Sequence, residues 1–297
     1  MHVAFGIEDP RQRLVFSRTP ALNPSFAIAE VVWIIAGRRD AAFLQPWNNH
    51  LAEFTGDDSK LHGAYGYRLR RHLGFDQLRN AADALRNKPM QRQIVLQIWD
   101  SRVDAPLRDG SARSEDIPCN VFSCVKVVNG RLEWLQLMRS NDLILGLPYN
   151  IFQWTMLQEI LAGWLGLELG SYNQVSDSLH IYERDIHTFA MSDVRSSSIS
   201  SSDLRLPMEH SEQVFAVLAA AIEVIGLSTD PDTVLAQLRL TSLPIDYEDL
   251  LRVMVVERLR RLGSGVLASR VTGEIRDAAL QYSVMNWNTR FKGESWQ

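Results

Sequence analysis

The spacing of apolar and polar residues predicts both helices and strands in the region before about residue 193. Helices are indicated at 25–36, 76–87 and 151–164, and strands at 93–99 and 179–182. Asn23 and Pro24 are residues typical of the start of a helix, and Gly37 follows the first helix as a stop signal. These patterns place helices and strands in a single α+β body.

A hairpin is the clearest local prediction. Two β-like runs, 121–128 and 131–138, flank Asn129-Gly130, and this dipeptide favours the tight turn that joins antiparallel strands. The polar, charged segment 102–115 before the hairpin is predicted to be a loop.

The composition changes at 196–202, where six serines surround one isoleucine, as in a flexible polar link. Beyond it, the apolar periodicity predicts helices at 211–225, 232–240, 247–262 and 271–282. The predicted organisation is an α+β catalytic domain at 1–193, a linker at 194–208 and a helical C-terminal region at 209–297.

Composition excludes several classes of protein. The net charge of −4 gives no global basic field for nucleic-acid binding, and the start of the chain does not resemble a signal peptide. Apolar stretches such as 215–225 are too short to span a bilayer. The two cysteines, Cys119 and Cys124, have the odd spacing that places strand residues on opposite faces, so we expect no disulfide and a reducing cytoplasm.

Candidate chemistry centres on Cys119. A lone cysteine is most often a buried core residue, and no histidine has a spacing that identifies a protease-type partner for it. No metal cluster or glycine-rich phosphate loop stands out. Together with Arg139-Ser140 and Asn150, however, the thiol could attack an electron-poor ring on a phosphorylated ligand, while the amide reads the edge of the ring.

The spacing of these residues resembles the thymidylate synthase family over roughly 24–190. Pro118-Cys119 is followed by the run from Arg139 to Asn150, which matches the family's Arg-Ser-x-Asp-x-x-Leu-Gly-x-Pro-Phe-Asn with Tyr149 in place of phenylalanine. Further matches are Glu30 with Trp33, Tyr65-Gly66, Arg92 and His180-Ile181-Tyr182. The fold this resemblance implies is α+β, a thymidylate synthase-like mixed sheet packed with helices, here with an α-helical C-terminal appendix.

The resemblance implies three catalytic residues. Cys119 would attack C6 of a uracil-type ring, Glu30 would organise water and proton transfers at C4, and Tyr65 would assist removal of the C5 proton. A thiolate needs a lowered pKa, and a nearby arginine would lower the pKa of Cys119 electrostatically.

The resemblance also implies the substrate-binding residues. Arg139 and Ser140 would hold the 5′-phosphate, Asn150 would bind O4 and N3, and the backbone of Asp142 would hold the ring carbonyl. The sugar 3′-hydroxyl would be bound by His180 and Tyr182.

The implied partners are a pyrimidine nucleoside monophosphate and a second copy of the chain. In the homodimer, Arg92 would reach the phosphate in the partner's site. The one-carbon donor would be 5,10-methylene-tetrahydrofolate, with no metal, no nucleic acid and no membrane involved.

Several positions depart from the family pattern. Asn120 replaces the histidine that usually follows the cysteine, and Gln93 replaces the second arginine of a usual pair. No N-terminal arginine loop is evident, although Arg11, Arg13 or Arg18 could substitute for it, and helices replace the segment that closes over folate.

Another departure concerns a tryptophan that shields the exocyclic methylene in the family. Its place is taken here by Leu51 or Ala52, with Trp47 earlier in the chain. A less shielded methylene would be open to water, so methyl and hydroxymethyl products are both expected possibilities.

The predicted activity is C5 one-carbon transfer to a uridylate-type nucleotide. One alternative is a cytidylate 5-hydroxymethylase of the same family, although the Asn150 amide favours a uracil edge. An alternative of another class is a non-catalytic nucleotide-binding or interaction protein on this fold.

Overall fold

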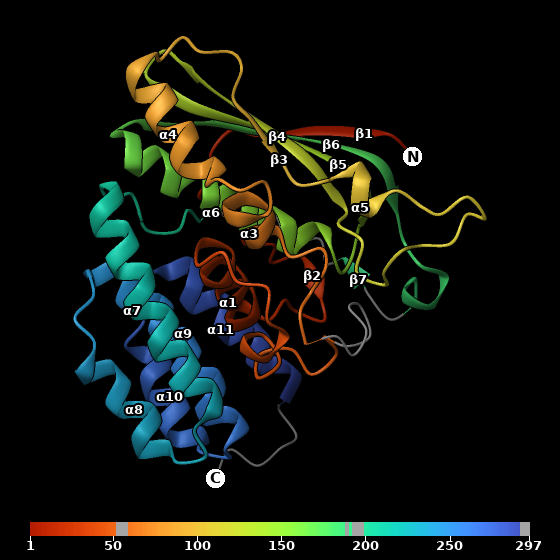
Figure 1. Cartoon of the computed structure of the whole chain (residues 1–297). Coiled ribbons are helices and arrows are strands. Elements are labelled where there is room, and N and C mark those ends of the chain that lie inside the picture. Colours follow the sequence, from red (N-terminus) through yellow and green to blue (C-terminus); the bar gives the residue numbers. More distant parts are fainter. Residues whose placement is uncertain (52–58, 188–189, 192–198, 292–297) are drawn as a thin grey trace.

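The computed structural model describes residues 1–51, 59–187, 190–191 and 199–291. A five-stranded sheet has the order β1-β6-β5-β4-β3, and its neighbouring strands are antiparallel except for the parallel pair β5–β6. Helices lie against one face of this sheet (Figure 1), which confirms the α+β class. The strands are β1 (Val3–Ile7), β3 (Val95–Gln97), β4 (Asn120–Val128), β5 (Arg131–Asp142) and β6 (Glu168–His180).

The predicted hairpin is confirmed as β4 and β5. Asn129 and Gly130 form the turn with φ values of 50° and 74°, the left-handed conformation that this dipeptide adopts readily. The turn sets the register in which Val128 pairs with Arg131 and Cys124 with Leu135.

The strand prediction at 179–182 was wrong in extent, because β6 runs from Glu168 to His180, and β1 was not predicted. The inward positions of β6 include Gly170, Gln174 and Ser176, all buried. Their small or polar side chains hide the apolar alternation from which a strand is predicted. The strand is held instead by its two neighbours, β5 and β1.

Two central helices lie on the inner side of the sheet, one packed against β5 and β6 and the other packed on that helix. In α1 (Pro24–Ile35), the Asn23 side chain accepts hydrogen bonds from the backbone N–H of Ser25 and Phe26, as predicted for its cap. The long buried helix α6 (Leu147–Leu165) ends at Gly166, whose φ of 66° suits glycine. Along the sheet edge, α4 (Gln77–Asn87) begins at Asp76.

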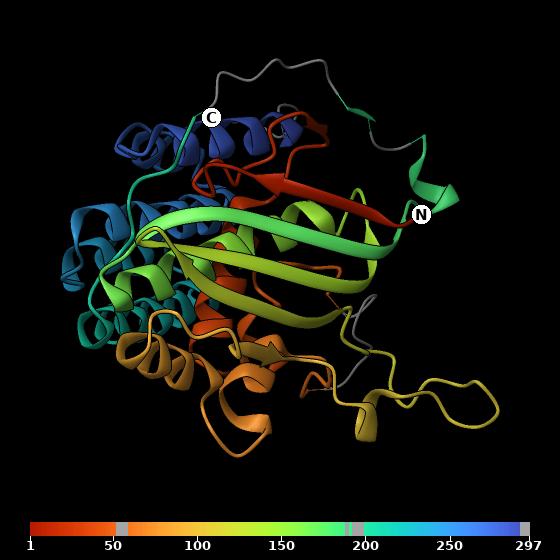
Figure 2. The ribbon, with the colours of Figure 1, turned by 90° about the horizontal axis from the view of Figure 1, so that it is seen from above.

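The remaining short elements connect these parts. They are β2 (Arg18–Thr19), β7 (Ala190–Met191), α3 (Tyr65–Tyr67), α5 (Ser101–Asp104) and the single turns η1 (Ala41–Phe43), η2 (Arg68–His72), η3 (Glu183–Asp185) and η4 (Thr289–Phe291). The segment that follows α5 is the predicted loop and projects from the body (Figure 2).

The C-terminal helices are α7 (Met208–Leu227), α8 (Pro231–Leu240), α9 (Ile245–Arg261), α10 (Gly265–Gly273) and α11 (Ala278–Asn288). The first three match the predictions, but the single helix predicted at 271–282 is wrong. The chain breaks between α10 and α11, where the buried Asp249 carboxylate accepts hydrogen bonds from the backbone N–H of Arg276 and Asp277. This distant carboxylate binds the backbone N–H groups at the break. The local signals of the break are Gly273, which ends α10, and Asp277, whose side chain caps α11 by accepting from the backbone N–H of Leu280 (2.9 Å).

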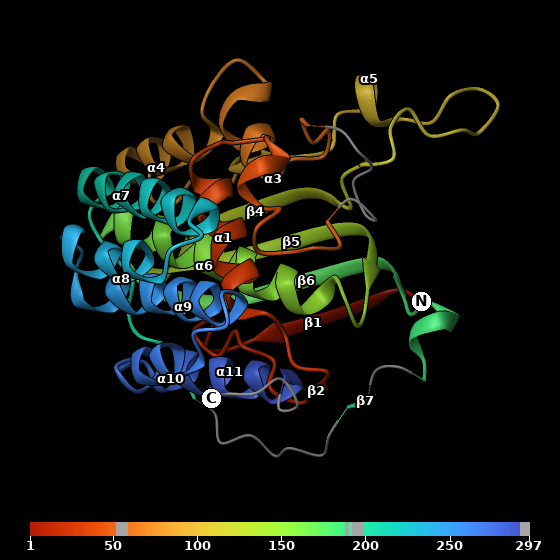
Figure 3. The same cartoon turned by 90° about the horizontal axis from the view of Figure 1, so that it is seen from below.

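The C-terminal helices pack directly on α1 and α6 and share their apolar core (Figure 3). By length and apolar composition α7 could cross a membrane, yet it packs against α1, α6 and α9, so its apolar residues serve the core. Part of the predicted linker, 194–198, lies outside the described residues. The division into 1–193, 194–208 and 209–297 stays a prediction.

Candidate active site

Cys119 lies directly before β4 and is a free, partly buried thiol. Arg139, on the neighbouring strand β5, holds the cysteine segment in place. Its backbone N–H donates to the carbonyl of Cys119 (2.9 Å), and its guanidinium donates to the carbonyls of Pro118 (3.0 Å) and Ile117 (3.1 Å). The guanidinium also stacks over the Trp99 ring at 5.3 Å.

The structure raises the pKa of Cys119, whereas a lowered pKa was expected. Burial raises the pKa of this thiol, and the negative charge of Asp116 adds to the rise, whereas Arg139 opposes it only in part. The ligand-free site therefore holds the cysteine mainly as the thiol at neutral pH.

Glu30 projects from α1, and burial raises the pKa of its carboxyl to about 8. A hydrogen bond with Gln153 opposes this rise. The Oε2 atom of Glu30 is buried and has no hydrogen-bond partner among the described residues. A buried carboxyl that is protonated at neutral pH and has a spare oxygen suits proton transfer to a bound ligand.

Tyr65 begins α3 and brings its hydroxyl to the same place. Burial raises its pKa, and it lies within electrostatic reach of Cys119 and Glu30. The next residue, Gly66, is pressed against α1, because a Cβ there would lie 2.4 Å from the carbonyl oxygen of Ile34. This close approach places the tyrosine beside the glutamate helix, so the three predicted catalytic residues converge.

Asn150 lies in the first turn of α6, on the helix-covered side of the sheet, and is hydrogen-bonded to Asn120, the residue after Cys119. Its Nδ2 donates to Oδ1 of Asn141 (3.2 Å), and its Oδ1 accepts from Nδ2 of Asn120 (3.5 Å). Asn120 in turn accepts from Nε2 of Gln136 (2.8 Å). Sequence reasoning treated Asn120 only as a departure from the family and missed Gln136, although polar residues at inward positions of a predicted strand were a usable signal.

The other predicted substrate residues lie at the ends of β5 and β6. Asp142 pairs in register with His180, and Ser140 with Ser178. The Asp142 carboxylate accepts from the backbone N–H of Ile144 (2.7 Å), so it fixes the turn that leads to α6. The rings of His180 and Tyr182 meet edge to face at 5.0 Å, with Tyr182 49% exposed.

Arg92 does not reach this site within one chain. It is exposed and precedes β3, in which Val95 pairs with Cys124 and Gln97 with Phe122. The antiparallel pairing therefore carries Arg92 away from the end of β4 that bears Cys119. Its predicted contact with the partner's site stays a prediction.

The three N-terminal arginines have different surroundings. Arg13 is fully buried and forms an ion pair with Glu159 of α6 (2.5 Å), which makes it unsuitable for the phosphate. Arg11 pairs with Asp9 (3.8 Å). Arg18 is buried within electrostatic reach of Tyr149 and Asp142, so it is the one that approaches the predicted substrate residues.

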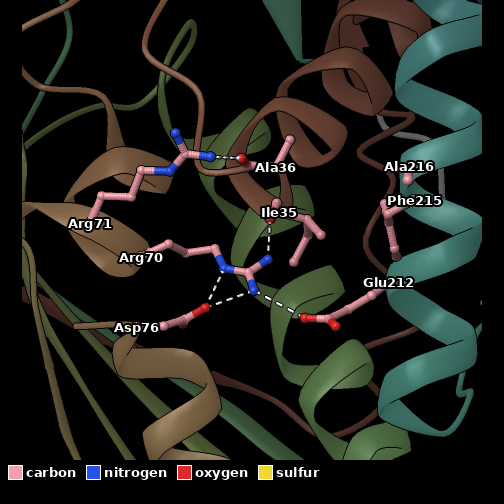
Figure 4. A pocket seen from close by; sticks show the side chains of 8 residues that line it. All are labelled: Ile35, Ala36, Arg70, Arg71, Asp76, Glu212, Phe215 and Ala216. Atoms are coloured by element: carbon pink, nitrogen blue, oxygen red, sulfur yellow. Dashed lines mark hydrogen bonds and ion pairs between the residues drawn. The ribbon is translucent and has the colours of Figure 1, made fainter.

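A separate cavity of about 300 Å³ lies between the end of α1 and α7 (Figure 4). Arg70 crosses it, donating to the carbonyl of Ile35 and pairing with Asp76 (2.7 Å) and Glu212 (3.1 Å). None of the predicted site residues lines this cavity. Arg70 is paired with the two carboxylates and Arg71 donates to the carbonyl of Ala36 (3.3 Å), so these side chains secure the C-terminal end of the helix that carries Glu30.

No group of three or more His, Cys, Asp or Glu residues in the described ranges is arranged to hold a metal ion. The groups that converge at the site are a thiol, a protonated carboxyl, a phenol and oriented amides, next to arginine side chains.

Comparison of the sequence with known protein families identifies the family of the chain. The model of the thymidylate synthase family matches residues 10–236, which is well over half of the 297-residue chain. The chain belongs to the thymidylate synthase family. The match extends through α7 and into α8, so part of the helical C-terminal region falls within it.

Similar curated proteins come from phages and a bacterium. The deoxyuridylate hydroxymethyltransferase of Bacillus phage SP01 is 35% identical over 194 residues, covering 62% of this chain and 50% of that protein. The deoxyuridylate hydroxymethyltransferase of Pseudomonas phage M6 is 33% identical, covering 61% and 51%. The thymidylate synthase of Clostridium beijerinckii is 29% identical, covering 54% and 58%. The chain spans about half the length of the curated relatives it matches.

Proposed function

We propose that the chain transfers a one-carbon unit from 5,10-methylene-tetrahydrofolate to C5 of a uridylate-type pyrimidine nucleotide. The reaction proceeds through a covalent adduct between Cys119 and C6 of the ring. The observation that carries this proposal is the convergence of Cys119, Glu30, Tyr65 and Asn150 from separate elements in a chain of this family.

In the first step, the Cys119 thiol loses its proton to water and the resulting thiolate forms a bond to C6. The electron pair of the C5–C6 double bond moves toward C5 and O4. Asn150 donates to O4 and accepts from N3–H, which stabilises that charge. The protonated carboxyl of Glu30, whose pKa is about 8, supplies a further proton on this side of the ring.

In the second step, C5 forms a bond to the one-carbon unit, which folate supplies at the oxidation level of formaldehyde. The C5 proton then leaves with the help of Tyr65. Because burial raises the pKa of this phenol, it stays neutral and acts by passing protons rather than as a standing base. The electron pair left at C5 expels tetrahydrofolate and leaves an exocyclic methylene on C5. After water or hydride adds to this methylene, the Cys119 thiolate leaves C6 and the C5–C6 double bond is restored.

Arg139 and Ser140 hold the phosphate in this proposal, and His180 with Tyr182 holds the sugar. Arg139 has donors to spare, because a guanidinium carries five N–H groups and the two carbonyl bonds to the cysteine segment use only some of them. Arg18, which lies near Asp142, is the best placed of the N-terminal arginines to add positive charge.

A homodimer in which Arg92 crosses to the partner's site is supported by the outer face of the sheet. Figure 2 shows no helix of the described chain over this face. Val95 is 52% exposed and Leu135 37% exposed there, beside the ion pair of Lys126 and Glu133 (3.5 Å), so this face offers a second copy both apolar and charged contacts. The cytoplasm stays the expected compartment, where free thiols such as Cys119 and Cys124 persist.

The proposed product is the hydroxymethyl nucleotide, formed when water adds to the exocyclic methylene. Trp47 is 1% exposed and packs beside Gly226 of α7, so it is not available to shield a methylene from water. Leu51, one of the two residues expected in the shielding position, is aliphatic, and Ala52 lies outside the described residues. The names of the two phage relatives agree with this outcome.

The test is to incubate the protein with dUMP or dCMP and methylene-tetrahydrofolate and to resolve the products by mass. Hydroxymethyl-dUMP with release of tetrahydrofolate supports the proposal, whereas methyl product accompanied by dihydrofolate, seen by absorbance, identifies a methylase. Absence of product from every pyrimidine nucleotide would refute the enzymatic function. The Cys119→Ser variant is the control for turnover by contaminants.

A further inference from the structure

Buried amide side chains form a continuous hydrogen-bonded relay beneath the sheet, from Trp134 to Asn150. The order of the hydrogen-bonded side chains is Trp134, Gln136, Asn120 and Asn150, and Gln136 and Asn120 are fully buried. Buried amides of this kind are costly unless each donor and acceptor is matched, so the order of donors and acceptors along the relay is constrained.

The direction of the relay is set at Gln136. The indole N–H of Trp134, which can only donate, lies 3.1 Å from Oε1 of Gln136. On the other side, Nε2 of Gln136 lies 3.3 Å from the carbonyl oxygen of Phe122, which can only accept. Rotating the Gln136 amide by 180° would therefore oppose like groups on both sides.

The orientation of the Gln136 amide also determines the orientations of the Asn120 and Asn150 amides. Because Asn120 accepts from Gln136 (2.8 Å), its Nδ2 points the other way, toward Oδ1 of Asn150 (3.5 Å). Asn120 is also hydrogen-bonded to the Tyr65 side chain. Nδ2 of Asn150 is then left to donate to Oδ1 of Asn141 (3.2 Å), so the Asn150 amide is held in one orientation before any ligand binds.

We propose that Gln136 and Asn120 are positioning residues that hold the Asn150 amide in a single orientation and thereby select a uracil ring over a cytosine ring. The inference rests on the proposed function, in which Asn150 reads the ring edge. Uracil presents an acceptor at O4 and a donor at N3, whereas cytosine presents a donor at N4 and an acceptor at N3. An amide free to rotate could match either ring, but an amide fixed by its neighbours matches only one.

The experiment measures the dissociation constants of dUMP and dCMP for the intact protein and for variants that cut the relay at two points. Gln136→Met keeps a similar side-chain volume but cannot accept from Trp134 or donate to Asn120. Asn120→Leu removes the link to Asn150. We expect the wild type to prefer dUMP by tenfold or more, and each cut to lower that preference by roughly tenfold.

Two further variants separate positioning from simple structural damage. Ser123→Ala removes a second donor to Oε1 of Gln136 (2.6 Å) but leaves Trp134 in place, so the preference should not change. Asn120→His offers one ring nitrogen to accept from Gln136 and another to donate to Asn150, so it should restore the preference that Asn120→Leu loses.

The outcomes are distinct. A wild type that binds dUMP and dCMP equally, or cut variants that weaken both nucleotides by the same factor, would overturn the relay proposal while leaving the proposed function intact. Failure of the wild type to bind any pyrimidine nucleotide would refute the proposed function itself. Thermal unfolding of each variant identifies any that do not fold, and either cut alone suffices for the test.

Discussion

The inner face of the sheet and the layer of C-terminal helices bury different kinds of polar side chain among their apolar ones. Beneath the sheet, Asn120, Gln136 and Gln174 are fully buried and hydrogen-bonded to other side chains. In the helical layer, buried apolar side chains such as Leu218 and Leu259 surround a few buried carboxylates, among them Asp249, and the buried polar side chains among the described residues there include no amide. Both regions contribute to the interior of one compact chain.

Apolar burial and buried hydrogen bonds make different contributions to the folded chain. Apolar burial is non-directional and stabilises the fold in proportion to the area removed from water. A buried hydrogen bond adds little net stability, but it fixes which atom donates and which accepts. We infer that the helical layer mainly supplies stability, whereas the polar interior supplies the orientation of site residues. The predictions below test this separation.

The largest effect is expected for Cys119→Ser. Loss of the attacking thiol should reduce turnover by about 10⁴-fold or more, on the scale of nucleophile loss in other enzymes. The free energy of unfolding in urea should change little, because the two side chains are close in size. Residual turnover near the wild-type level would contradict the covalent mechanism.

The second-largest effect is expected for Glu30→Gln. Turnover should fall by about 10²–10⁴-fold, which is the usual contribution of a positioned acid or base. The control is nucleotide binding, which should fall much less than turnover. Comparable losses in both would indicate that Glu30 holds the ligand rather than moving protons.

The raised pKa of Glu30 predicts how the free energy of unfolding depends on pH. The pKa of Glu30 is about 8 in the folded chain and 4.5 for an ordinary glutamate, so the folded state binds the extra proton between these values. Wild-type stability should therefore be greatest below about pH 4.5 as far as this group is concerned, and should decline as pH rises through about 8. Urea unfolding at several pH values should show a smaller decline in Glu30→Gln.

Leu259→Ala, in the middle of the helical layer, should lower the free energy of unfolding by about 2–5 kcal/mol because it leaves a cavity in the core. Turnover per folded molecule, measured well below the unfolding temperature, should stay within a factor of two. A variant that kept its stability but lost turnover would break the proposed division between the two regions.

The smallest effect is expected at the surface of the helical layer. The exposed Asp230 caps α8 by accepting from the backbone N–H of Thr233 (2.9 Å), and Asp230→Ala should lower the free energy of unfolding by less than Leu259→Ala does. Asp230→Asn retains a capping oxygen and is the matched control. Both should leave turnover unchanged.

Local signals predicted much of the fold. The Asn129-Gly130 turn, the Asn23 cap and three of the C-terminal helices were found because turn chemistry, capping and helical spacing act within a few residues. β6 was misjudged because its inward side chains are polar and its strand form depends on β5 and β1. The break before α11 was missed although Gly273 and the Asp277 cap are local signals, because the apolar periodicity was read across them; the contact from Asp249 that stabilises the break is distant in the sequence.

For the candidate site, the spacing from Cys119 to Asn150 was enough to predict the family, and the family match confirms it. The roles of the individual site residues stay predictions. The arrangement around them was not predictable, because Arg13 is withdrawn into an ion pair with Glu159 and Arg18 alone approaches Asp142. Which of several arginines faces a site depends on packing rather than on spacing.

The sequence by itself determined which reactive groups the chain carries and in what order, since Pro118-Cys119, Arg139-Ser140 and Asn150 are read directly from it. The tertiary structure decided how those groups are tuned. Burial raises the pKa of Cys119 despite the nearby arginine, and a relay through Gln136 holds the Asn150 amide in one orientation. The physical reason is that desolvation and hydrogen-bond direction depend on neighbours from other elements, which only the folded chain brings together.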